Sequence, residues 1–283
     1  MRLSYYPGCA LHGTSEEYNE SILAVCRHLG VELEEVRDWN CCGASAAHVM
    51  NDGLAVSLPA RNLQIAEEMG MEMLVPCAAC FNRLKTAHAA ILNSAGGQWA
   101  SYKGELTILH VNELFNKQPL PQLLQESVVR PLEGLQAIPY YGCLTVRPPK
   151  IMAPENCEDP KGLDLILSTL GAQVVPWSFK TDCCGGNLAL TRSEIVRKLT
   201  GDLFEMALEA GGECIVTDCP MCQTNMDTRQ AEIEQERGKK YSLPVFYITE
   251  LMGLALGEKK TCNWLKKHLV DPRPVLRRKG LIQ

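Results

Sequence analysis

The chain has 283 residues, enough for one large domain or for two domains of about 140 residues each. Its hydrophobic content of 46% and charged content of 22% are those of an ordinary folded protein and exclude extended disorder. The net charge of -5 is uneven: residues 258–283 hold eight Lys or Arg and two acids (+6), which leaves -11 on the remainder. An acidic body of this kind argues against general nucleic-acid binding.

The cellular context also follows from simple features of the chain. The N-terminus runs directly into Cys9, the first cysteine of a motif, so a cleaved signal peptide is not expected. No apolar run approaches the roughly 18 residues that a membrane span needs, so direct membrane insertion is not expected either. We therefore expect a cytoplasmic protein, in which 14 cysteines are better explained by metal or redox chemistry than by disulfides.

Strands and helices alternate in the first part of the chain. Thr14 and Glu17 have the spacing of a capping box in front of a helix that ends at Gly30. In chain order we predict a strand over 3–6, that helix, a strand over 31–36, a helix over 59–69, a strand over 73–76, a helix over 80–92, a strand over 106–111 and a helix from Asn112.

The second part repeats this order. We predict a strand ending at Tyr140-Tyr141, a helix over 163–170, a strand over 173–177, a helix over 192–210, a strand over 215–217 and a helix from Met221. The alternation favours an α/β fold with two pseudo-twofold-related Rossmann-like halves, each with a small, mostly parallel sheet flanked by helices.

The stretch 118–139, rich in Pro, Gln and Leu, is the predicted seam between the two copies. We expect one domain over 1–125, a second over 126–257, and a basic C-terminal extension over 258–283. The extension is interpreted as a solvated tail, with docking to an acidic partner as the alternative.

One cysteine signature occurs twice. A single cysteine is followed by Cys-Cys-Gly and then, after 34 residues counted from the pair, by Cys-x-x-Cys. The first set is Cys9, Cys41, Cys42, Cys77 and Cys80, and the second set is Cys143, Cys183, Cys184, Cys219 and Cys222. These cysteines fall at predicted strand ends, where open α/β sheets bind ligands, so we expect the thiols to converge.

Five thiols per set, two of them adjacent, favour an iron–sulfur cluster over a single ion. Zinc sites typically use four ligands, and both side chains of an adjacent pair are hard to place on one small ion. Gly43 and Gly185-Gly186 free the backbone to wrap around bulky sulfide. Zinc in one or both halves, and an ordinary cubane cluster with one spare thiol, remain open alternatives.

Other residues carry weaker signals. Cys26 and Cys214 are predicted core residues, and Cys157 and Cys262 receive no role. Three groups of residues lie near the motifs. His12 and His48 are candidate proton donors, and Lys180, Arg147 and Lys150 are candidate contacts for an anionic substrate. Trp39 and Trp177 are expected to pack against the cluster sites. His28, His88 and His110 belong to no recognisable constellation.

The arrangement of these motifs resembles the cysteine-rich CCG domain family. A duplicated chain of this length is similar to the B subunit of heterodisulfide reductase, over Tyr5 to about Gly257. The resemblance implies two non-cubane [4Fe–4S] clusters, one on each set of five cysteines. It also implies a disulfide substrate, such as the coenzyme M–coenzyme B heterodisulfide or an analogue, that receives one electron from each cluster.

The chain has neither a ferredoxin-type cysteine run nor a dinucleotide-binding glycine motif, so its electrons must come from elsewhere. The resemblance implies a ferredoxin-like subunit with two [4Fe–4S] clusters and a flavin-containing electron-input subunit. A related function is the alternative: a CCG electron-transfer subunit of a hydroxy-acid- or quinone-linked oxidoreductase.

Overall fold

The computed structural model describes residues 1–44, 46–93, 99 and 101–283, with the side chain of His48 left out. It contains two parallel four-stranded sheets with equivalent strand orders, β2-β1-β3-β4 and β6-β5-β7-β8. The first sheet comprises β1 (Arg2–Tyr5), β2 (Glu32–Glu35), β3 (Met73–Leu74) and β4 (Ile108–Leu109). The second comprises β5 (Gln136–Tyr140), β6 (Gln173–Val174), β7 (Cys214–Thr217) and β8 (Val245–Tyr247). The predicted α/β class with two similar halves is confirmed.

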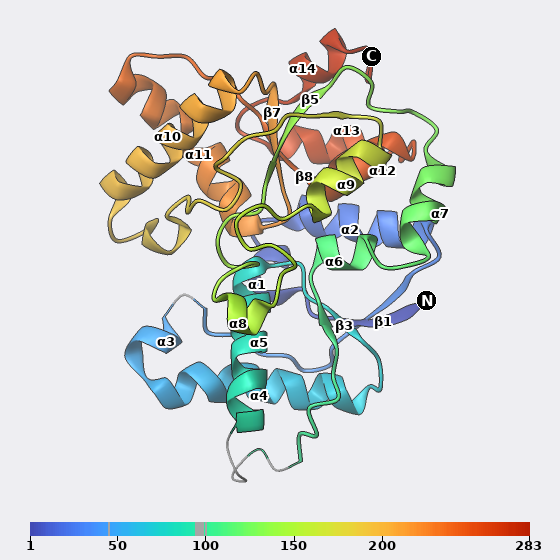
Figure 1. The fold of residues 1–283 in the computed structure, drawn as a ribbon, viewed down its shortest axis with the longest axis vertical. Coiled ribbons are helices and arrows are strands. Elements are labelled where there is room, and N and C mark those ends of the chain that lie inside the picture. The colour runs from blue at the N-terminus through green and yellow to red at the C-terminus, as the bar shows by residue number, and fades with distance from the viewer. Residues whose placement is uncertain (45, 94–98, 100) are drawn as a thin grey trace.

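Helices flank both sheets (Figure 1). The first half contains α1 (Gly8–Leu11), α2 (Glu16–His28), α3 (Ala47–Met50), α4 (Asp52–Glu68), α5 (Ala78–Asn93) and α6 (Val111–Phe115), and α7 (Leu120–Ser127) lies in the predicted seam. The second half contains α8 (Pro149–Met152), α9 (Gly162–Thr169), η1 (Gly186–Leu188), α10 (Ser193–Glu209), α11 (Pro220–Arg237) and α12 (Ile248–Ala255). The chain ends with α13 (Thr261–Trp264), η2 (Leu265–Lys267) and α14 (Arg273–Arg278).

Two predicted helix starts are wrong. The N-cap of α2 is Ser15, which makes no side-chain cap bond, so the capping box of Thr14 and Glu17 does not form. Helix α4 begins before the predicted residue 59, because Asn51 caps it by accepting a hydrogen bond from the Leu54 amide (3.0 Å). Pro59 consequently lies inside the helix rather than at its start.

The two halves contact each other reciprocally. Helix α2 packs on α12 and α6 on α9, while α1 packs on α11 and α8 on α5. The rings of Tyr18 and Tyr247 stack 4.1 Å apart, and the Ser21 and Thr249 hydroxyls are 2.7 Å apart. Figure 1 shows α2 and α6 between the sheet regions, and one hydrophobic core includes residues from both halves.

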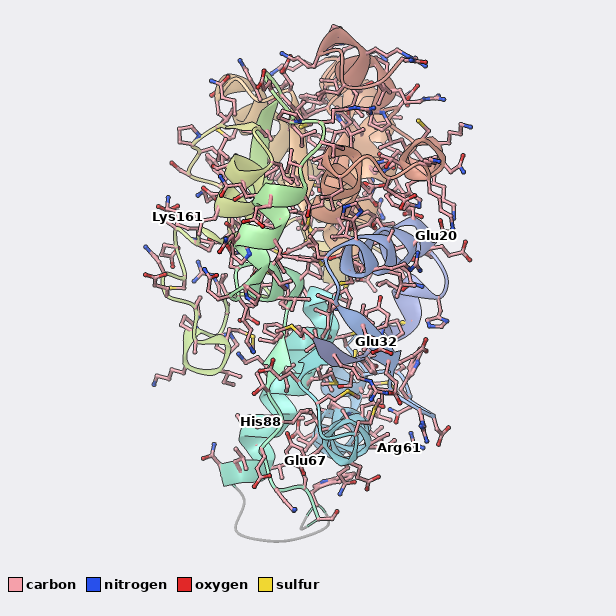
Figure 2. All side chains as sticks on the ribbon, turned by 90° about the vertical axis from the view of Figure 1, so that its right-hand side faces the viewer. Glu20, Glu32, Arg61, Glu67, His88 and Lys161 are labelled. Atoms are coloured by element: carbon pink, nitrogen blue, oxygen red, sulfur yellow. The ribbon has the colours of Figure 1, made fainter. Side chains whose placement is uncertain are left out.

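The C-terminal segment is not the solvated tail that its charge predicted. Trp264 is fully buried, and Leu265, Leu276 and Leu281 belong to the core shared by the halves. The Trp264 indole donates to Glu20 of α2 (2.9 Å), a residue labelled in Figure 2. These apolar side chains attach the segment to the body, while most of its Lys and Arg residues are exposed.

Across the described part of the chain, every helix is too short or too polar to span a lipid bilayer.

Candidate metal centres

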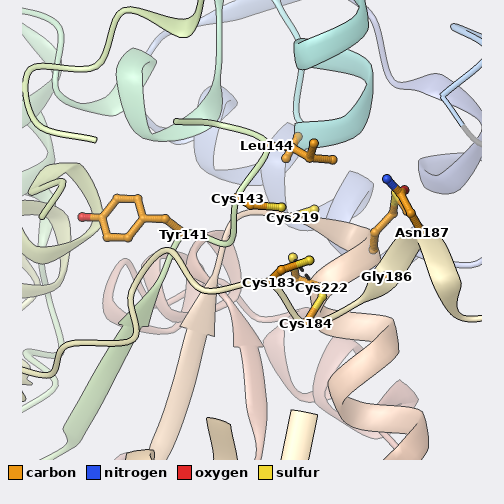
Figure 3. A pocket seen from close by; sticks show the side chains of 11 residues that line it. Tyr141, Cys143, Leu144, Cys183, Cys184, Gly186, Asn187, Cys219 and Cys222 are labelled. Carbon is orange, nitrogen blue, oxygen red and sulfur yellow. Dashed lines mark hydrogen bonds between the residues drawn. The ribbon is translucent and has the colours of Figure 1, made fainter. Parts of the chain in front are cut away.

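The thiols of the second set line one pocket, drawn in Figure 3. The space free of protein atoms at this pocket, open solvent at its mouth included, is about 370 Å³. Besides the five cysteines, its lining consists of uncharged residues: Ala78, Tyr141, Leu144, Gly186, Asn187 and Met221. The five thiols of the second set therefore share one largely apolar pocket.

One sulfur–sulfur contact is common to both sets. The Cys42 and Cys80 sulfurs are 3.1 Å apart, and the corresponding Cys184 and Cys222 sulfurs are 3.7 Å apart. These four thiols are buried, whereas the first cysteine of each adjacent pair is exposed. All 14 cysteines are free thiols, so no disulfide competes for the two sets.

Glycine is required next to the thiols in each half. Gly8 and Gly142, which precede the single cysteines, have φ values of +68° and +66°. A Cβ at either position would lie 3.0 Å from a sulfur, that of Cys80 in the first half and of Cys222 in the second. A side chain would strain the backbone and press on a thiol at the same time.

A second glycine pair holds the Cys-Cys turns. Gly43 and Gly185 have φ values of +75° and +77°. Their amides donate to the sulfurs of Cys41 (3.4 Å) and Cys183 (3.2 Å). Backbone N–H groups aimed at sulfur stabilise the thiolate form that a metal requires.

Two tyrosines that the sequence interpretation missed support the same turns. The Tyr6 hydroxyl donates to the carbonyl of Asn40 (2.8 Å), and the Tyr140 hydroxyl donates to that of Asp182 (2.7 Å). Each acceptor immediately precedes a Cys-Cys pair. Burial, together with the neighbouring thiols, raises the pKa of both phenols, which therefore remain donors. The sequence feature that could have identified these tyrosines is the Tyr-x-Gly-Cys spacing, which occurs in both halves.

The predicted packing of two tryptophans agrees with these positions. Trp39 lies against Tyr6, with ring centroids 5.4 Å apart, and Trp177 lies 6.1 Å from Tyr140. Both indoles are partly buried and pack against the core clusters that contain Cys42 and Cys184.

Hydrogen bonds between sulfurs separate the pKa values within each set. Bonds from Cys41 and Cys80 lower the pKa of Cys42 to about 4, while the bond to Cys42 raises the pKa of Cys41. In the second set the bond from Cys143 lowers the pKa of Cys183 to about 6. Each set can therefore hold a thiolate at neutral pH, and thiolate is the sulfur form that binds metal.

The two sets are interlocked across the junction. Ala78, between Cys77 and Cys80, lines the pocket of the second set, and Met221 packs against the first half's core. Asn82 donates to the carbonyls of Leu144 (2.9 Å) and Arg147 (2.7 Å). The segment after Cys143 is thus fixed by α5, the helix that contains Cys80.

The donor atoms of both sets are of the kind that iron–sulfur clusters use. Each offers five soft sulfur donors, which is the chemistry of iron–sulfur ligation. Within the described ranges, no group of three or more His, Cys, Asp or Glu side chains is arranged to hold one metal ion.

Lys180 does not have the predicted position for an anionic substrate. Its side chain is 4% exposed, and its ammonium pairs with Asp159 (2.9 Å) and Asp164. Its carbonyl accepts from the amides of Tyr141 and Gly142, just before Cys143. A buried, neutralised ammonium has little charge to offer an anion, so Lys180 instead supports the loop.

The other weak candidates are dispersed. Arg147 pairs with Glu158 (2.9 Å), and Lys150 is exposed on α8. The His12 side chain is 47% exposed, contacts Glu35 (3.1 Å) and has its ring tilted against that of Trp39, so it lies beside the first set. His48 lies in α3, but its side chain is outside the described part of the structure.

Three further residues considered in the sequence analysis have ordinary environments. Cys26 and Cys214 are buried in the core, as predicted. His88, in the lower half of Figure 2, is 2.6 Å from the Tyr102 hydroxyl.

Comparisons with known proteins place these features in a family. A family model described as "Cysteine-rich domain" (CCG) matches residues 3–85 and 139–227. The chain is 32% identical to the 8-methylmenaquinol:fumarate reductase membrane anchor subunit of Wolinella succinogenes, over 95% of this chain and 96% of that one. It is 26% identical to the B subunit of the ferredoxin:CoB-CoM heterodisulfide reductase of Methanosarcina mazei, over 90% and 89% of the two chains.

Among solved structures, a hypothetical protein from Helicobacter pylori matches with a TM-score of 0.71 at 9% identity. The match covers 95% of this chain and 52% of that one, so this chain spans about half the length of that structure. At this identity the likeness supports the fold alone.

Proposed function

We propose a function from the premise that the chain belongs to the cysteine-rich CCG domain family, with two copies of the domain. We infer that it is the iron–sulfur subunit of a multisubunit oxidoreductase. The observation that carries this proposal is the pair of five-thiol sets with matching glycine, tyrosine and sulfur contacts, brought together at one junction.

Each set would hold one non-cubane [4Fe–4S] cluster. The ligands would be Cys9, Cys41, Cys42, Cys77 and Cys80 in the first half and Cys143, Cys183, Cys184, Cys219 and Cys222 in the second. Five donors exceed the four of an ordinary cube, and the Gly43 and Gly185 amides support the extra thiolate of each adjacent pair.

The leading reaction is reduction of a disulfide. When bound, the clusters would supply one electron each. The S–S bond breaks as it takes up two electrons and two protons, which gives two thiols. The electrons would come through a ferredoxin-like partner subunit from a flavin-containing one in a cytoplasmic complex. Ala78, Leu144 and Met221 would give the second cluster site apolar walls, and His12 and His48 remain candidate proton donors.

A quinol-linked reaction is the second candidate. Its support is that the pocket lining, apart from the five thiols, consists of uncharged residues, and that the ammonium of Lys180 is neutralised by two aspartates. These features suit an uncharged ring better than an anionic coenzyme. The relative from Wolinella succinogenes is named as part of a methylmenaquinol:fumarate reductase.

The test begins with the anaerobically purified full chain. Two clusters predict about eight irons per chain, with matching sulfide. Reduced viologen is then supplied with the coenzyme M–coenzyme B heterodisulfide, and a parallel assay supplies a soluble menaquinol analogue and a dye acceptor. Disulfide turnover supports the leading reaction, and quinol oxidation alone supports the second. Stoichiometric zinc without iron contradicts both.

A further inference from the structure

A buried histidine lies where the two halves meet. His110 follows β4 and precedes α6, and its amide donates to the Glu113 carboxylate (2.8 Å). Its side chain is 1% exposed. The backbone is therefore fixed by the start of a helix, and the imidazole is shielded from water.

Both ring nitrogens of His110 contact residues that precede a Cys-x-x-Cys segment. Nε2 is 2.9 Å from the carbonyl oxygen of Pro76, which is followed by Cys77. Nδ1 is 3.1 Å from Oδ2 of Asp218, which is followed by Cys219. One imidazole thus connects the Cys-x-x-Cys segment of the first half with that of the second.

The two contacts differ in kind: the contact with Pro76 is a hydrogen bond, whereas the contact with Asp218 has the distance of an ion pair but not the geometry of a hydrogen bond. A carbonyl oxygen only accepts, so Nε2 must carry a hydrogen. Nδ1 then faces a carboxylate oxygen, a contact that is favourable only with a proton between the two atoms. Burial lowers the pKa of His110, but the nearby groups, the Asp218 carboxylate foremost, together have the larger effect in the opposite direction, so the pKa lies above its ordinary value. Such a bridge gains strength from its low-dielectric surroundings.

Asp218 is held from the first half by two further residues. The Asn112 amide donates to Oδ2 of Asp218 (2.7 Å), and the Tyr18 hydroxyl donates to its carbonyl (2.7 Å). At the position that matches His110, the second half has Tyr247, whose hydroxyl donates to Gln223 of its own half (3.2 Å). The bridge through His110 therefore has no like-for-like copy at Tyr247.

We propose that His110 is a positioning residue that locks the two Cys-x-x-Cys segments together, so that the two thiol sites keep one relative placement. A substrate that exchanges one electron with each site needs a constant geometry between them, since small displacements are costly. This consequence rests on the proposed function, whereas the clamp itself rests on the contacts alone.

Two substitutions each remove one of the two His110 contacts, with Pro76 or with Asp218, which are the two arms of the clamp. The amide nitrogen of H110N can take the place of Nδ1, so the contact with Asp218 remains and that with Pro76 is lost. The longer H110Q places its amide near Nε2, which keeps Pro76 and loses Asp218. H110F removes both contacts at similar volume. Y247F is the matched control, because it removes one buried hydrogen bond at the equivalent helix start.

The first measurement is amide hydrogen exchange in the cluster-free full chain, over residues 76–80 and 218–222. A clamp needs both arms, so H110N and H110Q should each speed exchange about tenfold in both segments, the equivalent of one buried hydrogen bond. Y247F should leave residues 76–80 unchanged. The proposal would be overturned if each variant exchanged faster only in the segment whose contact it lost, or if neither variant changed the exchange rates. If H110F does not fold, the other two variants decide.

The second measurement uses the reconstituted chain. Iron content should stay at the wild-type value in H110N and H110Q, while the magnetic interaction between the two reduced clusters, read by EPR, should change in both. If H110N and H110Q bind iron but show the wild-type exchange rates and the wild-type magnetic interaction, the clamp is rejected and the proposed function stands. If both variants exchange faster in both segments but the wild-type chain binds no iron, the clamp stands and the proposed function is rejected.

Discussion

At the scale of single residues, the repeat preserves backbone geometry as well as ligands. Gly8 and Gly142 occupy the left-handed region, and each approaches the last thiol of its set. Tyr6 and Tyr140 hold the carbonyl before each Cys-Cys pair. These residues have no metal chemistry of their own, yet they determine where the sulfurs lie, as supporting residues around metal sites generally do.

The glycines give a direct test of this view. Gly8→Ala and Gly142→Ala should each lower iron content in the altered half, because the new Cβ would lie 3.0 Å from a ligand sulfur. Each should also lose roughly 1–2 kcal/mol of stability through the positive φ alone. Gly30→Ala is the matched control: its φ is +70°, and nothing lies within 4 Å of the new Cβ. Iron and sulfide analysis with denaturant unfolding would check this, and equal iron in all three variants would contradict it.

Removing a tyrosine hydroxyl should affect the stability of the fold. Tyr140→Phe leaves the Asp182 carbonyl without its donor and should cost about 1–2 kcal/mol in the free energy of unfolding. Urea unfolding of the metal-free chain measures the loss. A variant as stable as the wild type would show that water replaces the phenol.

At the scale of elements, the repeated order of strands and helices was predictable from the sequence, whereas features that occur in one copy alone were not. The alternation of strands and helices emerged because short apolar runs and glycine stops occur in both copies. The cap at Asn51 was overlooked because a proline eight residues later looked like a helix start. His110 received no role because its partner Asp218 lies 108 residues away, and only the assembled halves bring the two together.

The C-terminal segment shows why charge is a poor guide to position. Its basic residues suggested a free arm, but Trp264 is buried and bonded to Glu20. Trp264→Ala should therefore cost about 3–5 kcal/mol, as for a large aromatic side chain in a core. Lys266→Ala, an exposed neighbour, should change stability by less than about 0.5 kcal/mol. Denaturant unfolding of both variants distinguishes a packed segment from a solvated one.

The same segment should make stability depend on pH. His268 is buried, with Nε2 2.9 Å from the Glu250 carboxylate. Burial acts to lower the pKa of His268, but Glu250 outweighs it and raises this pKa to about 9. A raised pKa stabilises the fold fully below the unfolded value of about 6.5, and the contribution disappears as pH rises through about 9.

The expected loss between pH 6.5 and pH 9 is about 2–3 kcal/mol. His268→Gln should remove this slope. Because the thiols also titrate in this range, the quantity to compare is the difference between the wild type and His268→Gln, measured by urea unfolding at several pH values. A difference that does not vary with pH would show that His268 is not charged in the fold.

At the scale of the whole molecule, the two halves share packing as well as symmetry. Helix α2 of the first half packs on α12 of the second, and α6 packs on α9. The resulting core contains strand residues from both sheets. Duplication therefore produced one structure with two linked sites, and neither half can bury its junction face alone. The position of the domain boundary near 125 stays a prediction.

This coupling predicts a single cooperative unfolding transition. Ile22 of α2 is fully buried in the shared core, so Ile22→Ala should lower the free energy of unfolding by about 2–5 kcal/mol. Because the core belongs to both halves, the free energy of opening measured at the slowest-exchanging amides should fall by the same amount in β1 and in β5. Leu84→Ala, in a core built largely by the first half, removes a side chain of equal size and calibrates the effect. If β5 kept wild-type protection in Ile22→Ala, the halves would be opening independently, and a fixed placement of the two thiol sites would lose its structural basis.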